Sequence, residues 1–162
     1  MMERTKATSG TKLIVENRKA YHDYHILDRL EAGIELTGTE VKSLRQGRVN
    51  MGDSYAAVVN GELWLYAMHI SPYEQGNRFN KDPMRTRRLL LHKNEILRLY
   101  GQTRIEGLTL VPTKLYFKHG RVKVEIGLAR GKKTYDKRED EAKKQASREI
   151  DRHLKNRRHS ED

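Results

Sequence analysis

The sequence has no cysteine among its 162 residues, which excludes disulfide bonds and thiolate metal sites. It also has no long apolar run, which argues against a transmembrane helix. The first twelve residues, MMERTKATSGTK, lack the apolar middle of a secretory signal and show no periodicity. We therefore expect a cytoplasmic protein with no membrane partner, in which residues 1–12 are disordered.

Acidic residues are too few to balance the basic ones. The chain has 22 Asp and Glu against 33 Lys and Arg, for a formal net charge of +11. Residues 130–162 carry 12 basic and 8 acidic side chains, which leaves +7 for the preceding part. Both parts are basic, as is typical of a protein that binds the phosphate backbone of RNA or DNA. An anionic membrane would require a basic helix with a wide apolar face, which the sequence does not contain.

Alternation of apolar and polar residues predicts two β-hairpins. The runs SYAAVV and ELWLYAMHI flank Asn60 and Gly61, a pair that tolerates the positive φ angles of a type I′ turn. The runs LTLVPTKLYFK and RVKVEIGL flank a second turn at His119 and Gly120. Short strands separated by turns favour a mainly β fold, a small antiparallel OB-like barrel with short helices, over residues 13–130.

The segments between these strands predict two helices and a long loop. A β-like segment begins at Tyr24, with a bulge or bend expected at Gly33. Thr39 is expected to cap the short helix EVKSLRQ, and Gly47 to end it. The segment 71–85, SPYEQGNRFNKDPMR, is expected to be a loop that is either functional or disordered. The later segment HKNEILRLYGQTRIEG predicts a helix whose inward face consists of Ile96, Leu97, Tyr100 and Ile105.

The C-terminal segment, DKREDEAKKQASREIDRHLK, has the features of a helix but no core face. Asp136 and Glu139 resemble a capping box, and acid-to-base pairs at i, i+4 follow. Helix nucleation is costly and no tertiary face offsets it, so we expect residues 131–162 to be disordered alone and helical when bound. A solvated helix, or a disordered tail that only aids solubility, is the simpler alternative. The apolar stripe is narrow and consists of Ala142, Ala146, Ile150 and Leu154.

Four segments, taken together and in order, resemble the SmpB family, the bacterial partner of tmRNA. They are GTEVKSLRQG, DSY, DPMRTRRLLLHKNEI and GLARGKKTYDKR, and the resemblance extends from Asn17 to Arg138. It implies an OB-like barrel that binds the tRNA-like domain of tmRNA and a tail that becomes helical in the vacant mRNA channel of the small ribosomal subunit. The implied function is trans-translation, the rescue of stalled ribosomes, by a monomer in a 1:1 complex with tmRNA, without a cofactor, a metal or catalysis.

The same resemblance implies which residues bind. On the barrel, the residues implied to bind tmRNA are Asn17, Glu31, Leu90 and Lys123. Lys42 and Arg45, which the predicted short helix turns toward solvent, are further candidates for phosphate contacts. The residues implied to face the decoding centre and the mRNA channel are His22, Gly131, Lys132, Lys133, Tyr135, Asp136, Lys137 and Arg138. Gly131 is expected to form the bend between barrel and tail.

Two other functions remain open from the residues alone. A general RNA-binding OB-fold chaperone needs exposed aromatic rings, whereas the strand positions of the body's aromatic residues place them in the core: Trp64, Tyr66, Tyr116 and Phe117. A ribonuclease needs His, Lys and Glu side chains close in space, and no motif places them together. His22 and His25 stand three residues apart but lack the partners of a metal site.

Overall fold

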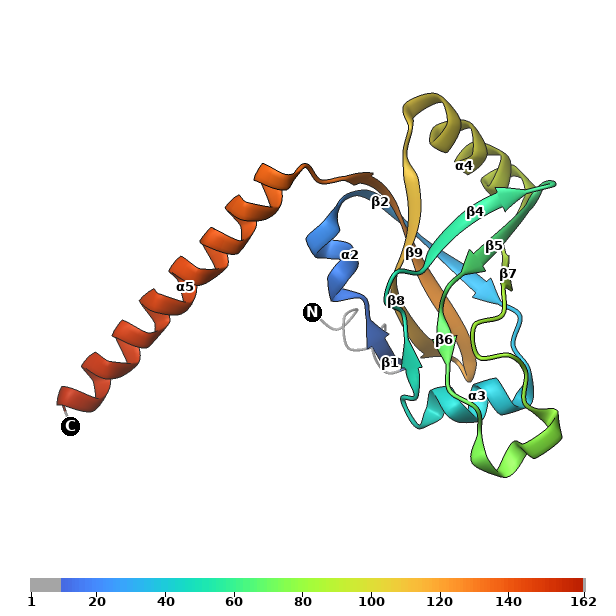
Figure 1. Ribbon diagram of the computed structural model, residues 1–162, viewed down its shortest axis with the longest axis horizontal. Helices are drawn as coiled ribbons and strands as arrows, with labels where there is room; N and C mark the ends of the chain where they lie inside the picture. The colour runs from blue at the N-terminus through green and yellow to red at the C-terminus, as the bar shows by residue number, and fades with distance from the viewer. Residues whose placement is uncertain (1–9, 162) are drawn as a thin grey trace. The chain divides into compact units, whose positions relative to one another are not determined.

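The computed structural model describes residues 10–161, and these fall into two compact units that divide after Gly131. The first unit is a β-barrel with short helices, and the second is dominated by one long helix (Figure 1). Most of the predicted N-terminal disorder, residues 1–9, lies outside the described residues. Thr11 and Lys12 already belong to the first strand, so the ordered barrel begins slightly earlier than residue 13.

The strands of the first unit are antiparallel and close into a ring. Their order in the main sheet is β1-β8-β4-β5-β7-β2-β9, and β8 also pairs with β9. This last pairing closes a six-stranded barrel, with β1 added outside it along β8, and it confirms the predicted mainly β, OB-like fold. The strands are β1 (Thr11–Glu16), β2 (Tyr24–Ile34), β4 (Tyr55–Val59), β5 (Glu62–Tyr66), β7 (Arg87–Leu90), β8 (Thr109–Lys118) and β9 (Arg121–Gly131), with a separate pair β3 (Val49–Asn50) and β6 (His69–Ile70).

Both predicted hairpins are confirmed, with the turn residues in the left-handed conformation. Asn60 and Gly61 have φ angles of 52° and 76° between β4 and β5. His119 and Gly120 have φ angles of 50° and 77° between β8 and β9. Positive φ at both central positions matches the right-handed twist of the flanking strands, so the turn residues set the register.

The bulge predicted at Gly33 lies elsewhere in β2. The register of β2 against β9 shifts between Ile26 and Asp28, whereas Gly33 is regularly paired. A Cβ on Gly33 would lie 3.2 Å from the Cβ of Leu90, its partner on β7. Glycine is therefore used for close approach to a neighbouring side chain rather than for a bulge.

Helix α3 (Gly38–Arg45) is capped by Thr37, not by Thr39 as predicted. Thr37 Oγ1 accepts a hydrogen bond from the Glu40 N–H, and Glu40 Oε1 accepts one from the Thr37 N–H at 2.9 Å, which forms a capping box. Gly47 follows the helix with φ 70°, as expected for a left-handed stop. Because the cap lies two residues earlier than predicted, the third residue of the helix is Glu40, which is buried.

Helix α4 (Lys93–Glu106) turns a different face inward from the predicted one. Ile96 and Leu99 are buried, whereas Leu97, Tyr100 and Ile105 are exposed, the last at 86%. Packing of α4 on β4 and β5 selects the inward face, which shares only Ile96 with the predicted one. Figure 1 shows α4 at one end of the barrel and α3 at the opposite end. Two short helical segments complete the first unit, α2 (Arg18–Asp23) and the 3-10 helix η1 (Glu74–Phe79).

The barrel core is filled by alternate residues of the strands. Leu63, Leu115, Val124 and Ile126 have no exposed surface. This confirms the inward face predicted for β9, because its apolar residues alternate with charged ones. Of the four aromatic residues expected in the core, Phe117 is partly buried and packs against it. Tyr116 is buried but lies outside the core cluster, and Trp64 and Tyr66 are partly buried.

The second unit contains helix α5 (Thr134–Glu161), which confirms the predicted helical conformation of the tail. Asp136 is the third helical residue rather than the cap, and its Oδ2 accepts a hydrogen bond from the Lys133 N–H at 3.3 Å. Every described side chain of α5 is exposed or half-exposed, including Ile150 at 60% and Leu154 at 52%. Disorder of this tail without a partner stays a prediction.

Candidate nucleic-acid interface

A row of residues crosses four strands on the outer face of the barrel. Leu90 of β7 pairs with Gly33 of β2, Gly33 pairs with Lys123 of β9, and Lys123 pairs with Tyr116 of β8. Glu31 precedes Gly33 by two residues and therefore points to the same face. Strand pairing thus brings together residues that are far apart in the sequence.

Glu31, Gly33, Leu90 and Lys123 of this row line a surface hollow of about 380 Å³. Leu90 contributes an apolar side chain that is 45% exposed, Lys123 a cation and Glu31 a carboxylate. Three of the six predicted tmRNA-binding residues therefore share one site. The complete lining is Glu31, Gly33, Leu90, Leu91, His92, Glu95 and Lys123.

The Glu31 carboxylate is held by side chains of β8. The Tyr116 hydroxyl donates a hydrogen bond to Glu31 Oε2, and Lys118 Nζ lies 3.3 Å from both carboxylate oxygens. Partial burial raises the pKa of Glu31, but hydrogen bonds from Tyr116 and Lys118 and the charge of Lys123 outweigh it and hold this pKa below its ordinary value. Glu31 is therefore ionised at neutral pH and fixed in position within a basic surface.

Tyr116 is the buried part of this arrangement, with 7% of the residue exposed. Burial, followed by the hydrogen bond to Glu31, raises the pKa of Tyr116, so the hydroxyl remains a donor at neutral pH. Lys114 Nζ lies over the Tyr116 ring, 5.7 Å from its centroid, which adds a further cation near this residue. A second hollow of about 360 Å³ borders Tyr116 here, and its lining also includes Leu13 and Glu125.

Asn17 lines neither of these two hollows, and its side-chain amide forms hydrogen bonds within the protein. It is 5% exposed and caps α2, with Oδ1 accepting from the Ala20 N–H at 3.2 Å. Its Nδ2 donates to the Pro112 carbonyl at 2.8 Å, and its backbone N–H donates to the Thr113 carbonyl at 2.7 Å. The structure therefore gives Asn17 the role of joining α2 to β8, and direct RNA contact stays a prediction.

Lys42 and Arg45 are exposed on α3, as predicted. Lys42 Nζ lies 5.4 Å from the centroid of the Tyr73 ring, which belongs to the loop before β7. Arg45 lines a separate hollow that also includes Lys12. Neither cation lines the hollow around Glu31, so the six predicted residues are distributed over several surfaces of the barrel.

His22 and Gly131 are the two predicted ribosome-facing residues of the first unit. His22 is half-buried in the last turn of α2, and its Nδ1 lies 2.9 Å from Asp23 Oδ1. Gly131 is the last residue of β9 and pairs with Tyr24 without a left-handed φ. Gly131 itself is still part of the extended, paired strand, and a bend between barrel and tail at this residue stays a prediction.

The predicted residues of the second unit begin just before α5. Lys132 Nζ forms an ion pair with Asp140, and the Lys133 N–H bonds to Asp136 as described above. An acidic residue in the first turn also suits the positive end of the helix dipole. Asp136 therefore stabilises the start of the helix.

Lys137 and Arg138 follow in the first two turns of α5. Arg138 is exposed and Lys137 is half-exposed. The backbone of Tyr135 is helical, but its side chain lies outside the described residues, so its stacking on a base stays a prediction. The local spacing places these cations on the helix surface, where they are accessible to phosphate.

Among the side chains that the structure describes, no group of three or more His, Asp or Glu residues is arranged to hold a metal ion. None of the described helices is long and apolar enough to span a membrane.

Comparisons with known proteins identify the family. The family profile described as SmpB protein matches residues 14–156. The chain belongs to the SmpB family. The SsrA-binding protein of Carboxydothermus hydrogenoformans is 68% identical over 144 residues, which cover 89% of this chain and 97% of that protein. The SsrA-binding protein of Desulfitobacterium hafniense is 60% identical over 149 residues, which cover 92% and 96% of the two chains.

A solved structure also resembles this SmpB-family chain. It is described as "tmRNA-SmpB: a journey to the center of the bacterial ribosome" and superposes with a TM-score of 0.63 at 56% identity. The match covers 74% of this chain and 85% of the other. Fold and sequence therefore agree on the family over most of the chain.

Sequence reasoning missed two residues that hold Glu31 in this SmpB-family barrel. Tyr116 was expected only as a core residue, and Lys118 was given no role. The alternation of β8 contained a signal, since Tyr116 and Lys118 are two residues apart and therefore share a face. The register that places this face beside Glu31, 85 residues from Tyr116, could not be read from that alternation.

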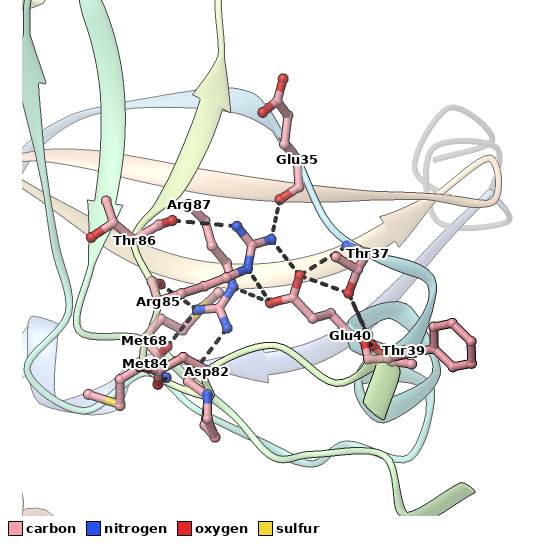
Figure 2. A network of polar contacts seen from close by, with 12 residues as sticks. Glu35, Thr37, Thr39, Glu40, Met68, Asp82, Met84, Arg85, Thr86 and Arg87 are labelled. Atoms are coloured by element: carbon pink, nitrogen blue, oxygen red, sulfur yellow. Dashed lines mark hydrogen bonds and ion pairs between the residues drawn. The ribbon is translucent and has the colours of Figure 1, made fainter. Parts of the chain in front are cut away.

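A buried ion-pair network was also missed (Figure 2). Arg87 Nε donates to Glu40 Oε2 at 2.7 Å, and Arg85 Nη2 donates to Glu40 Oε1 at 2.5 Å. Arg87 is 1% exposed and also donates to the Met68 carbonyl at 2.7 Å. The clue was the alternation of Arg87 and Leu89 in β7, which turns Arg87 to the same side as a core leucine. The network ties the loop before β7 to α3.

Proposed function

We propose that this SmpB-family protein binds the tRNA-like domain of tmRNA and delivers it to stalled ribosomes for trans-translation. The observation that carries the proposal is the hollow in which Glu31, Leu90 and Lys123 meet across three strands. The SsrA-binding relatives and the family membership support the same partner, since tmRNA is the SsrA RNA.

The hollow offers three kinds of contact to a folded RNA. Lys123 attracts a backbone phosphate, and Leu90 provides an apolar surface for a ribose or base. The ionised Glu31 accepts hydrogen bonds from base amino groups, which have no equivalent in the backbone. Because Tyr116 and Lys118 fix the carboxylate, Glu31 distinguishes a particular base edge instead of merely repelling phosphate.

The other predicted residues of the barrel act outside the hollow around Glu31. Lys42 and Arg45 on α3 contact backbone phosphates, and they add affinity that falls with salt concentration. Asn17 supports the interface through the order of α2, which its side chain caps. His22 in that same helix faces the decoding centre.

The tail occupies the vacant mRNA channel of the small subunit. Exposed cations on α5 contact ribosomal RNA, which offsets the cost of ordering a helix that has no buried face. The residues at the decoding centre and channel entrance are Gly131, Lys132, Lys133, Tyr135, Asp136, Lys137 and Arg138. Intact mRNA occupies the same channel, so the tail distinguishes stalled from translating ribosomes.

We also propose that the protein acts in the cytoplasm as a monomer, bound 1:1 to tmRNA, and that it catalyses no reaction. A ribonuclease would cleave labelled RNA specifically without added metal, and a general RNA chaperone would bind folded and single-stranded RNA equally. Incubation with labelled RNA and binding assays at several salt concentrations separate these functions.

The direct test is to isolate the full-length protein from cell extract and to sequence the RNA bound to it. The expected result is a dominant tmRNA peak. At matched salt, the folded tRNA-like domain should also bind more tightly than single strands of the same length. Equal affinities at every salt concentration would contradict the proposal, because backbone attraction alone would then explain binding.

The hollow itself is tested by Glu31→Ala. This variant should weaken binding to the tRNA-like domain while its thermal unfolding stays close to that of the original protein, because Glu31 lies at the surface. A loss of thermal stability as large as the loss of binding would reassign Glu31 to structure.

A further inference from the structure

The loop between β6 and β7, residues 71–86, is closed by its own side chains. Asn80 Oδ1 accepts a hydrogen bond from the Tyr73 N–H at 2.9 Å, and Asn80 Nδ2 donates to the Tyr73 carbonyl at 2.8 Å. A Cβ on Gly76 would lie 2.8 Å from Thr39 Cγ2, so the loop packs tightly against α3. These contacts fix the loop and its tip.

The base of the loop is held by the buried ion pairs. Arg85 and Arg87 both bond to Glu40 of α3, as Figure 2 shows. Arg87 Nη2 and the Ile70 N–H each donate to the Pro83 carbonyl at 3.0 Å. Removing one partner of such a network leaves a buried charge unpaired, so the loop is strongly held in one conformation.

This fixed loop presents an aromatic ring to solvent among cations. Phe79 is 67% exposed, and the Arg78 guanidinium lies 5.1 Å from the centroid of its ring. Arg78 and Lys81 are exposed and form no ion pair among the residues that the structure describes. The two acidic residues of the loop have partners of their own: Glu74 Oε1 lies 3.8 Å from Arg48 Nη1, and Asp82 accepts a hydrogen bond from the Met84 N–H within the loop at 2.9 Å.

We propose that Phe79 is a stacking site for an unpaired RNA base, with Arg78 and Lys81 contacting the flanking phosphates. An aromatic ring held outward loses little conformational entropy when a base stacks on it, and every base offers a π face. The surrounding charge favours a polyanion over a protein partner, which would require a larger apolar patch. The inference deepens the proposed function by adding a second RNA contact, separate from the hollow around Glu31.

Fluorescence anisotropy with a labelled single-stranded oligoadenylate tests the site in the full-length protein. Phe79→Ala should weaken binding about tenfold, in line with the contribution of stacking per base. Phe79→Tyr, which keeps a ring, should stay within about twofold of the original protein. In Phe79→Trp, the added indole fluorescence should be quenched by the same oligonucleotide, which reports stacking at this position directly.

The matched control is Ile105→Ala, because Ile105 is even more exposed but lies on α4. An equal effect of both alanine variants would overturn the proposal, as would an unquenched tryptophan or a tyrosine variant that binds as weakly as the alanine variant. Failure here is distinguishable from failure of the proposed function. Glu31→Ala is measured with the folded tRNA-like domain and Phe79→Ala with the single strand.

Discussion

At the scale of single residues, the hydroxyl of Tyr116 is the most informative atom of the interface. The Tyr116 ring is buried, and its hydroxyl donates a hydrogen bond to the carboxylate of Glu31 at the surface. Without this bond, strand pairing would fix the Glu31 backbone but not the rotamer of its side chain. Tyr116 is thus a positioning residue, which acts on RNA through Glu31. Its role in positioning depends on the hydroxyl, whereas a core aromatic residue contributes through its ring. The two contributions can be separated by a substitution that removes the hydroxyl and keeps the ring.

We expect Tyr116→Phe to weaken binding to the tRNA-like domain by about fivefold, as expected for loss of about 1 kcal/mol from one hydrogen bond. Without this donor, the pKa of Glu31 should rise toward its ordinary value, because the hydrogen bond favours the ionised form. Isothermal calorimetry measures the binding and an NMR titration measures the pKa. Tyr66→Phe on β5 is the control, and an unchanged Glu31 pKa would contradict the positioning role.

Glu40 is a second decisive residue, and its contribution is to stability. Burial raises the pKa of Glu40, but hydrogen bonds from Arg85, Thr37 and Arg87 outweigh it and hold this pKa below its ordinary value of 4.5. The unfolded chain therefore binds a proton at a pH where the folded protein does not. The resulting stabilisation is present above pH 4.5 and is lost as the pH falls through the lower, folded value.

Glu40→Gln should lower the free energy of unfolding at pH 7 by about 3 kcal/mol, because it leaves buried Arg87 without its carboxylate partner. The loss of stability on acidification below pH 4.5 should also be smaller in this variant. Urea unfolding at several pH values measures both effects. An acid dependence equal to that of the original protein would show that Glu40 does not contribute to it.

At the scale of elements, α5 differs from every helix of the barrel. Helices α3 and α4 each bury apolar residues, whereas the described side chains of α5 remain at least partly exposed along its length. Helical propensity and i, i+4 ion pairs each contribute only a few tenths of a kcal/mol per residue or pair. Its conformation in solution is therefore easily changed by substitution or by a partner.

Ile150→Pro should abolish tagging on stalled ribosomes, because proline costs about 3 kcal/mol in a helix interior. Binding of the isolated tRNA-like domain should not change, since that contact belongs to the barrel. An in vitro tagging assay on ribosomes stalled at the end of a message measures the first effect. Ile150→Ala, which preserves the helix, separates conformation from the loss of an apolar contact, and tagging by the proline variant would refute a helical requirement.

At the scale of the whole molecule, the two units predict a division of labour. The barrel unit ends at Gly131, and β9 pairs with β2 through Ala129, Arg130 and Gly131. Truncation after Gly131 therefore removes the tail without shortening a paired strand. A cut after Leu128 would remove those three pairs as well.

The chain truncated after Gly131 should keep its thermal stability and bind the tRNA-like domain within about threefold of the full-length protein, because its electrostatic attraction decreases only in part. It should not support tagging of stalled ribosomes. Binding assays and the tagging assay, run on the same preparation, decide this. Tagging by the truncated chain would refute the role of the tail, whereas loss of RNA binding would place part of the interface within it.

Several features of this protein follow from short stretches of sequence. The pairs Asn60–Gly61 and His119–Gly120 adopt left-handed backbone, so both hairpins could be predicted. The alternation of β9 and the helical pattern of α5 are likewise local. Net charge and family motifs do not depend on folding at all. The errors were also local, because Thr37 rather than Thr39 forms the cap and α4 turns a different face inward.

Only the tertiary structure decided how the site is assembled. Glu31 meets Tyr116 across 85 residues, and Glu40 meets Arg87 across 47. Leu90, Gly33 and Lys123 become neighbours only through the register of β7, β2 and β9. Periodicity states which residues share a face, but a one-residue shift in pairing reverses the face of a whole strand. Local sequence therefore determines which residue types are available to the interface, and long-range strand pairing determines how they are arranged.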